Sequence, residues 1–93
     1  MLKAKSMTQG YASEASGIGD IATGYKSQVS SNFAQAHGYQ AKVSSDFGYV
    51  WNGDNTLSTY TDHGKGTYNI NSLSGLSGVY LGNDSVADIL NRY

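Results

Sequence analysis

The sequence predicts an all-β chain: a parallel β-roll, then a small antiparallel β cap and a short C-terminal helix. One observation is a Gly-Tyr pair that recurs every fourteen residues, at Gly10, Gly24 and Gly38. Another is that small side chains recur at fixed offsets from each of these glycines. The period stops near residue 50, so we expect three parts: roll repeats at 1–51, a β-rich cap or neck at 52–83, and a helix at 84–93.

Each fourteen-residue copy divides naturally into two strands of about five residues joined by two tight turns. Small residues three, five, ten and twelve positions after each Gly alternate as one strand face does, so these positions are expected inside the roll. The predicted interior residues are Ala15, Val29, Val43, Ala22, Ala36 and Val50. Each repeated Gly is expected at a sharp turn that requires a positive φ. Asp20 breaks the small-residue pattern, so the first copy is expected to be frayed, capped or turned differently.

Bulky apolar residues are expected on the outward side of the second strand of each copy. These residues are Ile21, Phe33, Phe47 and Tyr49. A slab of three turns is only about 15 Å tall, and Ala-sized contents do not offset the entropy of ordering it. Exposed bulky apolar groups mark interaction surfaces. We therefore expect the chain to form an oligomer through this face.

The segment GYKSQVSSNFAQAHGYQAKVSS resembles the head repeat of trimeric autotransporter adhesins, the YadA-like or haemagglutinin-type repeat. That family follows G-x-x-[SA]-x-[AV]-x-G-x-x-[SA]-x-A with the same period, and the resemblance covers residues 10 to about 50. This chain departs from it at Ser31 and Ser45, where the family usually has Gly, and in its bulky Phe33 and Phe47. The resemblance implies a left-handed parallel β-roll with three chains around one axis, extracellular, on a bacterial surface or on a phage fibre.

Beyond residue 50, short β-favouring runs alternate with turn signals. The stretches 52–55 (NGDN) and 63–66 (HGKG) are turn sequences, and TLSTYT, GTYNIN and GVYLG read as strands. We expect an antiparallel segment that covers the open edge of the roll, with Trp51 filling the end of its interior.

The last ten residues carry a helical pattern. Ser85 and Asp88 fit a capping box, and apolar residues follow at helical spacing: Val86, Ile89, Leu90 and Tyr93. Because so short a helix is marginal in water, we expect the first turns of a three-stranded coiled coil, with these four residues at the trimer interface. Packing of the helix on its own subunit is the alternative.

The composition argues against several kinds of partner and against stabilisation by disulfides or Cys-based zinc sites. The net charge of −1 without a run of Lys or Arg argues against nucleic acid, and no apolar stretch is long enough to span a bilayer. The absence of Cys rules out disulfides and Cys-based zinc sites. The N-terminal stretch MLKAKSMTQG lacks the apolar core of a secretory signal, so we expect a piece of a longer polypeptide.

Candidate catalytic and metal motifs fail on spacing. Asp62-His63 suggests an acid–base pair, but SGLSG does not satisfy the G-x-S-x-G nucleophile motif. HGKGT lacks the phosphate-loop spacing, and the NGDN turn lacks the spacing of a calcium loop. His37 and His63 are not spaced as a metal site within one chain, although one His from each of three chains could hold an ion. We expect no catalytic residue, no cofactor and no metal ligand.

These expectations favour a structural and binding head module of a homotrimeric surface adhesin or fibre. It would attach to a glycan or a host surface protein by multivalent contact. The repeated tyrosines could stack on sugar rings, but packing between turns is the favoured interpretation. The alternatives are a purely structural fibre spacer, a fibre-borne polysaccharide-degrading enzyme, which needs two suitably spaced carboxylates, and a monomeric ice-binding solenoid, for which Thr lacks a repeating offset.

Overall fold

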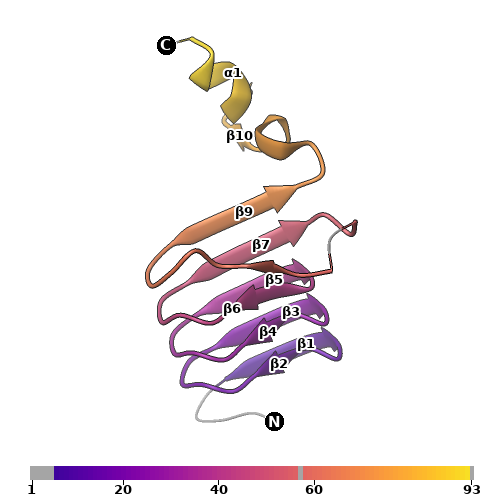
Figure 1. Ribbon diagram of the computed structural model, residues 1–93, viewed down its shortest axis with the longest axis vertical. Helices are drawn as coiled ribbons and strands as arrows, with labels where there is room; N and C mark the ends of the chain where they lie inside the picture. Colours follow the sequence, from indigo (N-terminus) through magenta and orange to yellow (C-terminus); the bar gives the residue numbers. More distant parts are fainter. Residues whose placement is uncertain (1–5, 57, 93) are drawn as a thin grey trace.

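The computed structural model describes residues 6–56 and 58–92 and shows a β-solenoid made of two parallel sheets. The long-strand sheet contains β1 (Met7–Tyr11), β3 (Ile21–Tyr25), β5 (Gln35–Tyr39), β7 (Tyr49–Gly53) and β9 (Tyr68–Ser72). The short-strand sheet contains β2 (Glu14–Ala15), β4 (Gln28–Val29), β6 (Ala41–Val43) and β8 (Tyr60–Thr61). The chain alternates between the sheets and climbs one tier with each turn, from the N-terminal end to β9 (Figure 1). The fold class predicted from the repeat is confirmed.

The repeated glycines form one column along a corner of the roll. Gly10 pairs with Gly24, and Gly24 pairs with Gly38, in the parallel register of the long-strand sheet. Their φ angles are 115°, 106° and 109°. A Cβ atom added to Gly24 would also overlap the carbonyl group of Gly38 in the next turn. Glycine is therefore required at this corner both for its backbone conformation and for the close approach of successive turns.

The apolar side chains that are fully buried among the described residues are small. All six residues expected in the interior are at most 1% exposed, and they form one core cluster with Ala34 and Ala41. The largest apolar side chains that are fully buried are valines. The two sheets therefore pack closely, and each buried Val contributes only about 1.5–3 kcal/mol of hydrophobic stabilisation.

Asp20 is fully buried and links the first two turns. Its Oδ2 accepts a hydrogen bond from the Gly17 amide at 2.7 Å, and its Oδ1 accepts one from the Ala34 amide at 3.2 Å. A buried carboxylate is costly unless such donors satisfy it, and charge-assisted bonds are stronger than neutral ones. The residue that breaks the sequence pattern thus replaces a small apolar group with a hydrogen-bonded bridge.

Residues 52–72 continue the roll instead of forming an antiparallel cap. Tyr49 pairs with Tyr68 and Ala41 pairs with Tyr60, all in parallel strands. The offset between these partners is nineteen residues, five more than in the earlier turns, and the extra residues lie in the turn between β7 and β8. The expected antiparallel arrangement of this segment is wrong, because an insertion confined to a turn leaves the strand stacking intact.

The C-terminal end of the interior is closed by polar side chains. Asn69 is the register partner of Val50 and is buried, and its Nδ2 donates to the carbonyl oxygens of Tyr49 at 3.1 Å and Thr67 at 3.2 Å. Trp51 does not fill this end. It is 42% exposed, because strand alternation turns it outward between the buried Val50 and Asn52.

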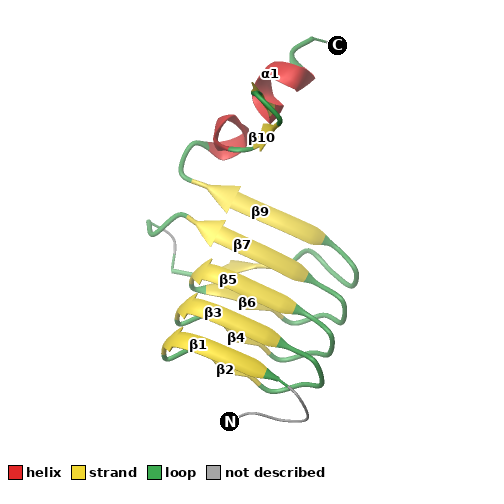
Figure 2. Cartoon of the chain, turned by 180° about the vertical axis from the view of Figure 1, so that it is seen from behind, coloured by secondary structure: helices red, strands yellow, loops and turns green. Residues whose placement is uncertain are grey.

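A small C-terminal module follows β9 and extends the molecule along its long axis (Figure 2). It contains the 3₁₀ turn η1 (Gly75–Gly78), β10 (Tyr80–Leu81), β11 (Asp84–Ser85) and α1 (Val86–Leu90). The strands β10 and β11 pair antiparallel, so the expected small antiparallel element is confirmed, and it lies directly before the helix.

The capping residue of the C-terminal helix is the one that the sequence predicts. The Ser85 side chain accepts a hydrogen bond from the Asp88 amide at 3.2 Å. No residue of α1 is buried in the single chain, and Leu90 is 57% exposed. Tyr93, expected on the same apolar stripe, lies outside the described residues.

Candidate functional site

The two outer faces of the roll differ in chemistry. The aromatic face, on the long-strand sheet, carries one column of Met7, Ile21, Gln35, Tyr49 and Tyr68 and a second of Gln9, Thr23, His37, Trp51 and Ile70. The polar face, on the short-strand sheet, carries one column of Glu14, Gln28, Lys42 and Thr61, flanked by Ser16, Ser30 and Ser44. Large apolar side chains are therefore concentrated on one outer face.

Phe33 and Phe47 lie at a corner of the roll and not on a strand face. Both precede the long strands β5 and β7, and both have left-handed φ angles, of 55° and 61°. Their rings stack with centroids 5.6 Å apart, and the two residues are 55% and 58% exposed. Their expected position on the outward side of the second strand is wrong, because the turn still runs through these residues, but they remain large exposed apolar groups.

Tyr49 lies at the centre of an aromatic cluster. Its ring stacks on the Tyr68 ring with centroids 4.3 Å apart, and the His37 ring lies 5.4 Å away on the other side. Burial, together with the neighbouring Tyr68 hydroxyl, raises the pKa of Tyr49. Ile21, the other residue expected at the oligomer interface on this face, is half-buried in the single chain.

His37 takes part in a line of three hydrogen-bonding side chains on the aromatic face. The Thr23 hydroxyl lies 2.6 Å from Nδ1, and the Gln35 Oε1 lies 3.0 Å from Nε2. Since a carbonyl oxygen only accepts, Nε2 carries the proton and Nδ1 accepts from the Thr23 hydroxyl. Burial lowers the pKa of His37, which favours this neutral form.

The repeated tyrosines form a packing ladder. The rings of Tyr11, Tyr25 and Tyr39 stack with centroid separations of 5.2 and 5.1 Å, and Lys26 Nζ lies 5.3 Å from the Tyr25 centroid. Stacked rings cover one another's faces, so the inner faces of the ladder do not provide platforms for sugars. The geometry favours packing, as the sequence interpretation does.

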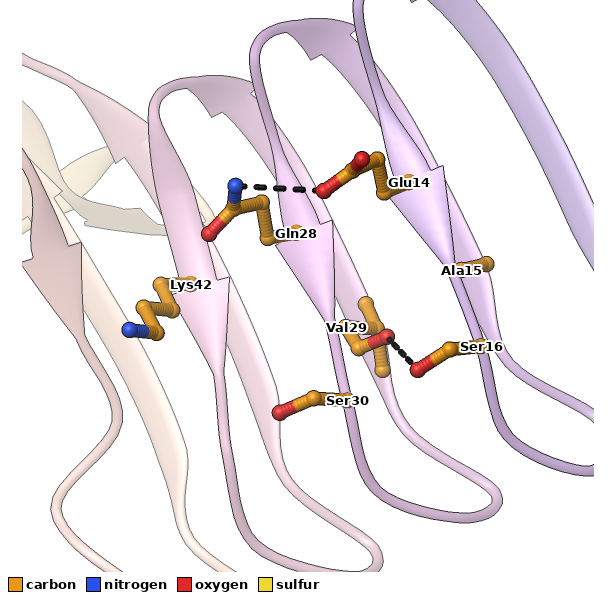
Figure 3. A pocket seen from close by; sticks show the side chains of 7 residues that line it. All are labelled: Glu14, Ala15, Ser16, Gln28, Val29, Ser30 and Lys42. Carbon is orange, nitrogen blue, oxygen red and sulfur yellow. Dashed lines mark hydrogen bonds between the residues drawn. The ribbon is translucent and has the colours of Figure 1, made fainter. Parts of the chain in front are cut away.

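A depression of about 440 Å³ lies on the polar face (Figure 3). Its lining comes from three successive turns and consists of Glu14, Ala15, Ser16, Gln28, Val29, Ser30 and Lys42. Gln28 Nε2 donates to Glu14 Oε1 at 3.3 Å, and Ser16 Oγ donates to the Val29 carbonyl oxygen at 3.3 Å. Within residues 6–56 and 58–92, neither the Lys42 ammonium nor the Ser30 hydroxyl has a hydrogen-bond or ion-pair partner. These two groups remain available to a ligand.

Sequence reasoning did not identify this depression. The position four residues after each repeated Gly holds Glu14, Gln28 and Lys42, which share no residue type. The signal that could have revealed it is the uniformly long and polar character of this position beside a serine column two residues later.

Asp62 and His63 do not assemble a catalytic triad. Asp62 Oδ1 accepts from the Ser44 amide at 2.9 Å and from the Ser44 hydroxyl at 3.2 Å, and His63 Nε2 lies 3.4 Å from the Tyr60 hydroxyl. A triad requires the acid to orient the imidazole and the imidazole to contact the nucleophile. Among the described residues, no group of three or more His, Cys, Asp or Glu side chains could hold a metal ion.

No family model, no curated protein and no solved structure matches the chain. The β-solenoid therefore rests on the structure itself, and the resemblance to adhesin head repeats stays a prediction. In the part of the chain that the structure describes, none of the helices has the length and apolarity needed to cross a bilayer.

Proposed function

We propose that the chain is a structural and binding head module of a homotrimeric surface fibre, which attaches to surface ligands by multivalent contact. The observation that carries this proposal is the distribution of apolar groups. Among the described residues, the fully buried apolar side chains are no larger than Val, whereas Phe33, Phe47 and Tyr68 are more than half exposed.

Assembly would bury the aromatic side chains that remain exposed when one chain folds. Aromatic side chains each remove about 150–250 Å² from water when they are fully buried, so they dominate the energetics of interfaces. The aromatic face and the Phe33–Phe47 corner together provide such groups along the length of the roll. A roll whose interior contributes little gains most of its stability from contacts between chains.

The helix α1 supports the same interpretation. Leu90 is exposed, and Val86 and Ile89 are only half-buried in the single chain. Three copies around one axis would place these side chains in a common seam, as in a trimeric coiled coil. Tyr93 is expected to extend that seam.

The trimer and the setting come from the resemblance to adhesin head repeats, which implies an extracellular location on a bacterial surface or a virion fibre. In this arrangement the polar face would point away from the axis and would be presented three times. Weak contacts at each copy would then gain avidity.

Light scattering with a circular dichroism spectrum tests the proposal. The expected species is rich in β structure and has three times the 9.9 kDa mass of one chain. A folded monomer at micromolar concentration would remove the argument for an interface at the aromatic face.

The double substitution Phe33→Ser and Phe47→Ser is expected to dissociate or unfold the trimer, because it removes the largest apolar groups at the corner. The matched control is Glu14→Ser with Gln28→Ser on the polar face, which should keep both mass and melting temperature. Retention of both quantities in the Phe variant would contradict the proposed interface.

A further inference from the structure

We propose that the depression on the polar face binds a saccharide that carries a carboxylate. This inference rests on the proposed function as a binding module and names the ligand class of that module. The depression lies on the short-strand sheet, on the opposite side of the roll from the aromatic face, so ligand binding and assembly use different surfaces.

The shape of the depression follows from the stacking of unequal side chains. Ser16 and Ser30 form a short column beside the long column of Glu14, Gln28 and Lys42, as Figure 3 shows. Successive tiers of a parallel sheet are about 4.8 Å apart, so three tiers present polar groups along a length comparable to a disaccharide. The volume of about 440 Å³ lies in the range of small-molecule sites, roughly 300–1,000 Å³.

The charged groups define the polarity of the ligand. The Lys42 ammonium has three donors and no carboxylate partner in the part of the chain that the structure describes. It therefore suits an acidic group at the β6 end of the depression. Glu14 at the β2 end is already tied to Gln28, and the remaining carboxylate oxygen can accept from a sugar hydroxyl.

Hydroxyl and methylene groups complete a lining suited to a sugar ring. The Ser30 hydroxyl is available to donate and accept, and the hydroxyl oxygen of Ser16 can accept while it donates to the Val29 carbonyl oxygen. The methylene stems of Gln28 and Lys42 provide apolar surface for the C–H groups of a ring. Alternating polar and apolar contacts of this kind fit an amphipathic ring better than a purely ionic ligand.

Other anionic ligands fit less well. A polyanion such as nucleic acid would meet the Glu14 carboxylate within the same depression, and the chain has a net charge of −1. None of the described residues that line the depression is aromatic, so they offer no stacking platform for a base. A single carboxylate on a neutral sugar framework matches one ammonium better than a chain of phosphates does.

An amide NMR titration of the folded protein with sialyllactose, and separately with lactose, tests the proposal. Sialyllactose should shift the resonances of Ser16, Ser30 and Lys42, and lactose should bind at least about tenfold more weakly because it lacks the charge-assisted contact. Equal binding of the two sugars, shifts confined to other regions, or no shifts would each overturn the proposal.

Variants separate this site from nonspecific attraction. Lys42→Gln should lose the preference for sialyllactose, whereas Lys65→Gln, the same charge change on an exposed turn that does not line the depression, should keep it. Ser30→Leu should block both sugars by filling the depression. Binding that survives Lys42→Gln and Ser30→Leu in folded protein would overturn the assignment.

The solution mass, measured on the same samples, distinguishes the two proposals. A trimer that shows no preference for the acidic sugar would overturn the saccharide site and leave the assembly standing. A monomer that binds sialyllactose at Lys42 would overturn the trimer and leave the site standing.

Discussion

The aromatic face and the polar face are built by the same turns of the chain, yet their chemistry is opposite. On the aromatic face the outward positions hold residues such as Ile21, Tyr49 and Trp51, and on the polar face they hold residues such as Glu14 and Lys42. Both faces enclose the same interior of Ala and Val. The repeat therefore constrains the interior and the corners, and it leaves the residues on each outer face free to vary.

The two faces are joined by the glycine corner, and breaking that corner should have the largest effect. Gly24→Val places a β-branched side chain at φ 106° and drives its Cβ into the backbone of Gly38. Both faces should lose their alignment, because the turns no longer stack. We expect a loss of at least about 3 kcal/mol in unfolding free energy, measured by urea denaturation.

The control for this substitution is Gly66→Asn. Gly66 also has a positive φ, 71°, but an added Cβ meets no atom of the described residues within 4 Å, and Asn tolerates this conformation. We expect a cost below about 1 kcal/mol. An equal cost for the two substitutions would mean that close approach of the turns does not determine the corner.

A matched pair of charge insertions compares the faces directly. Ile21→Lys places a charge on the aromatic face, and Gln28→Lys places the same charge on the polar face of the next strand. In the proposed trimer, the first should shift the mass measured by light scattering from three chains to one, since an unpaired charge in the core of the proposed interface costs several kcal/mol. The second should leave the mass unchanged. If Gln28→Lys dissociated the trimer and Ile21→Lys did not, assembly would use the polar face and not the aromatic face.

The stacked core could be predicted from the sequence because its requirements are local and repeated. The corner at Gly24 combines a φ of 106° with a close approach of the next turn, and the apolar positions of the narrow interior take small residues, so Gly24, Ala22 and Val29 each recur as a residue type at a fixed spacing. The cap at Ser85 could likewise be predicted, because it depends on a contact three residues away along the chain.

The fourth turn of the roll could not be predicted from the fourteen-residue period. Strand pairing fixes which residues stack, but it does not fix the length of the turn that joins two strands. Five extra residues in one turn shift Tyr68 and Asn69 away from the fourteen-residue spacing. Asn69 is also not recognisable as an interior residue from the sequence. The backbone carbonyl groups that accept hydrogen bonds from its amide come close to it only on folding. A match of Tyr49-x-x-Asn52 with Tyr68-x-x-Asn71 was the remaining signal.

The depression depends on side chains that no structural requirement repeats. Glu14, Gln28 and Lys42 point outward, so the stack tolerates any residue there, and only their alignment in three dimensions creates a site. Periodicity reports what the fold needs. A ligand site on an outer face is formed by positions that vary between the repeats, so the repeat pattern does not reveal it.

The smallest expected effect is a pH dependence of the unfolding free energy that comes from His37 on the aromatic face. Burial lowers the pKa of His37 below its ordinary value of 6.5, so the unfolded chain takes up a proton before the folded chain does. The contribution of the neutral His37 side chain to the unfolding free energy is therefore fully present above pH 6.5, and it is lost as the pH falls from there through the pKa of His37 in the folded chain. The facing groups Thr23, Gln35 and Tyr49 carry no charge at these pH values and do not compensate an imidazolium.

Melting temperatures of the unmodified chain and of His37→Gln, measured between about pH 7.5 and pH 5, isolate this contribution. The unmodified chain should lose more stability than the variant as the pH falls, and the difference should be small because the imidazole is only partly buried. If the His37 variant and the unmodified chain followed the same pH curve, the imidazole would not be held neutral by the aromatic face, and the electrostatic contrast between the two faces would be lost.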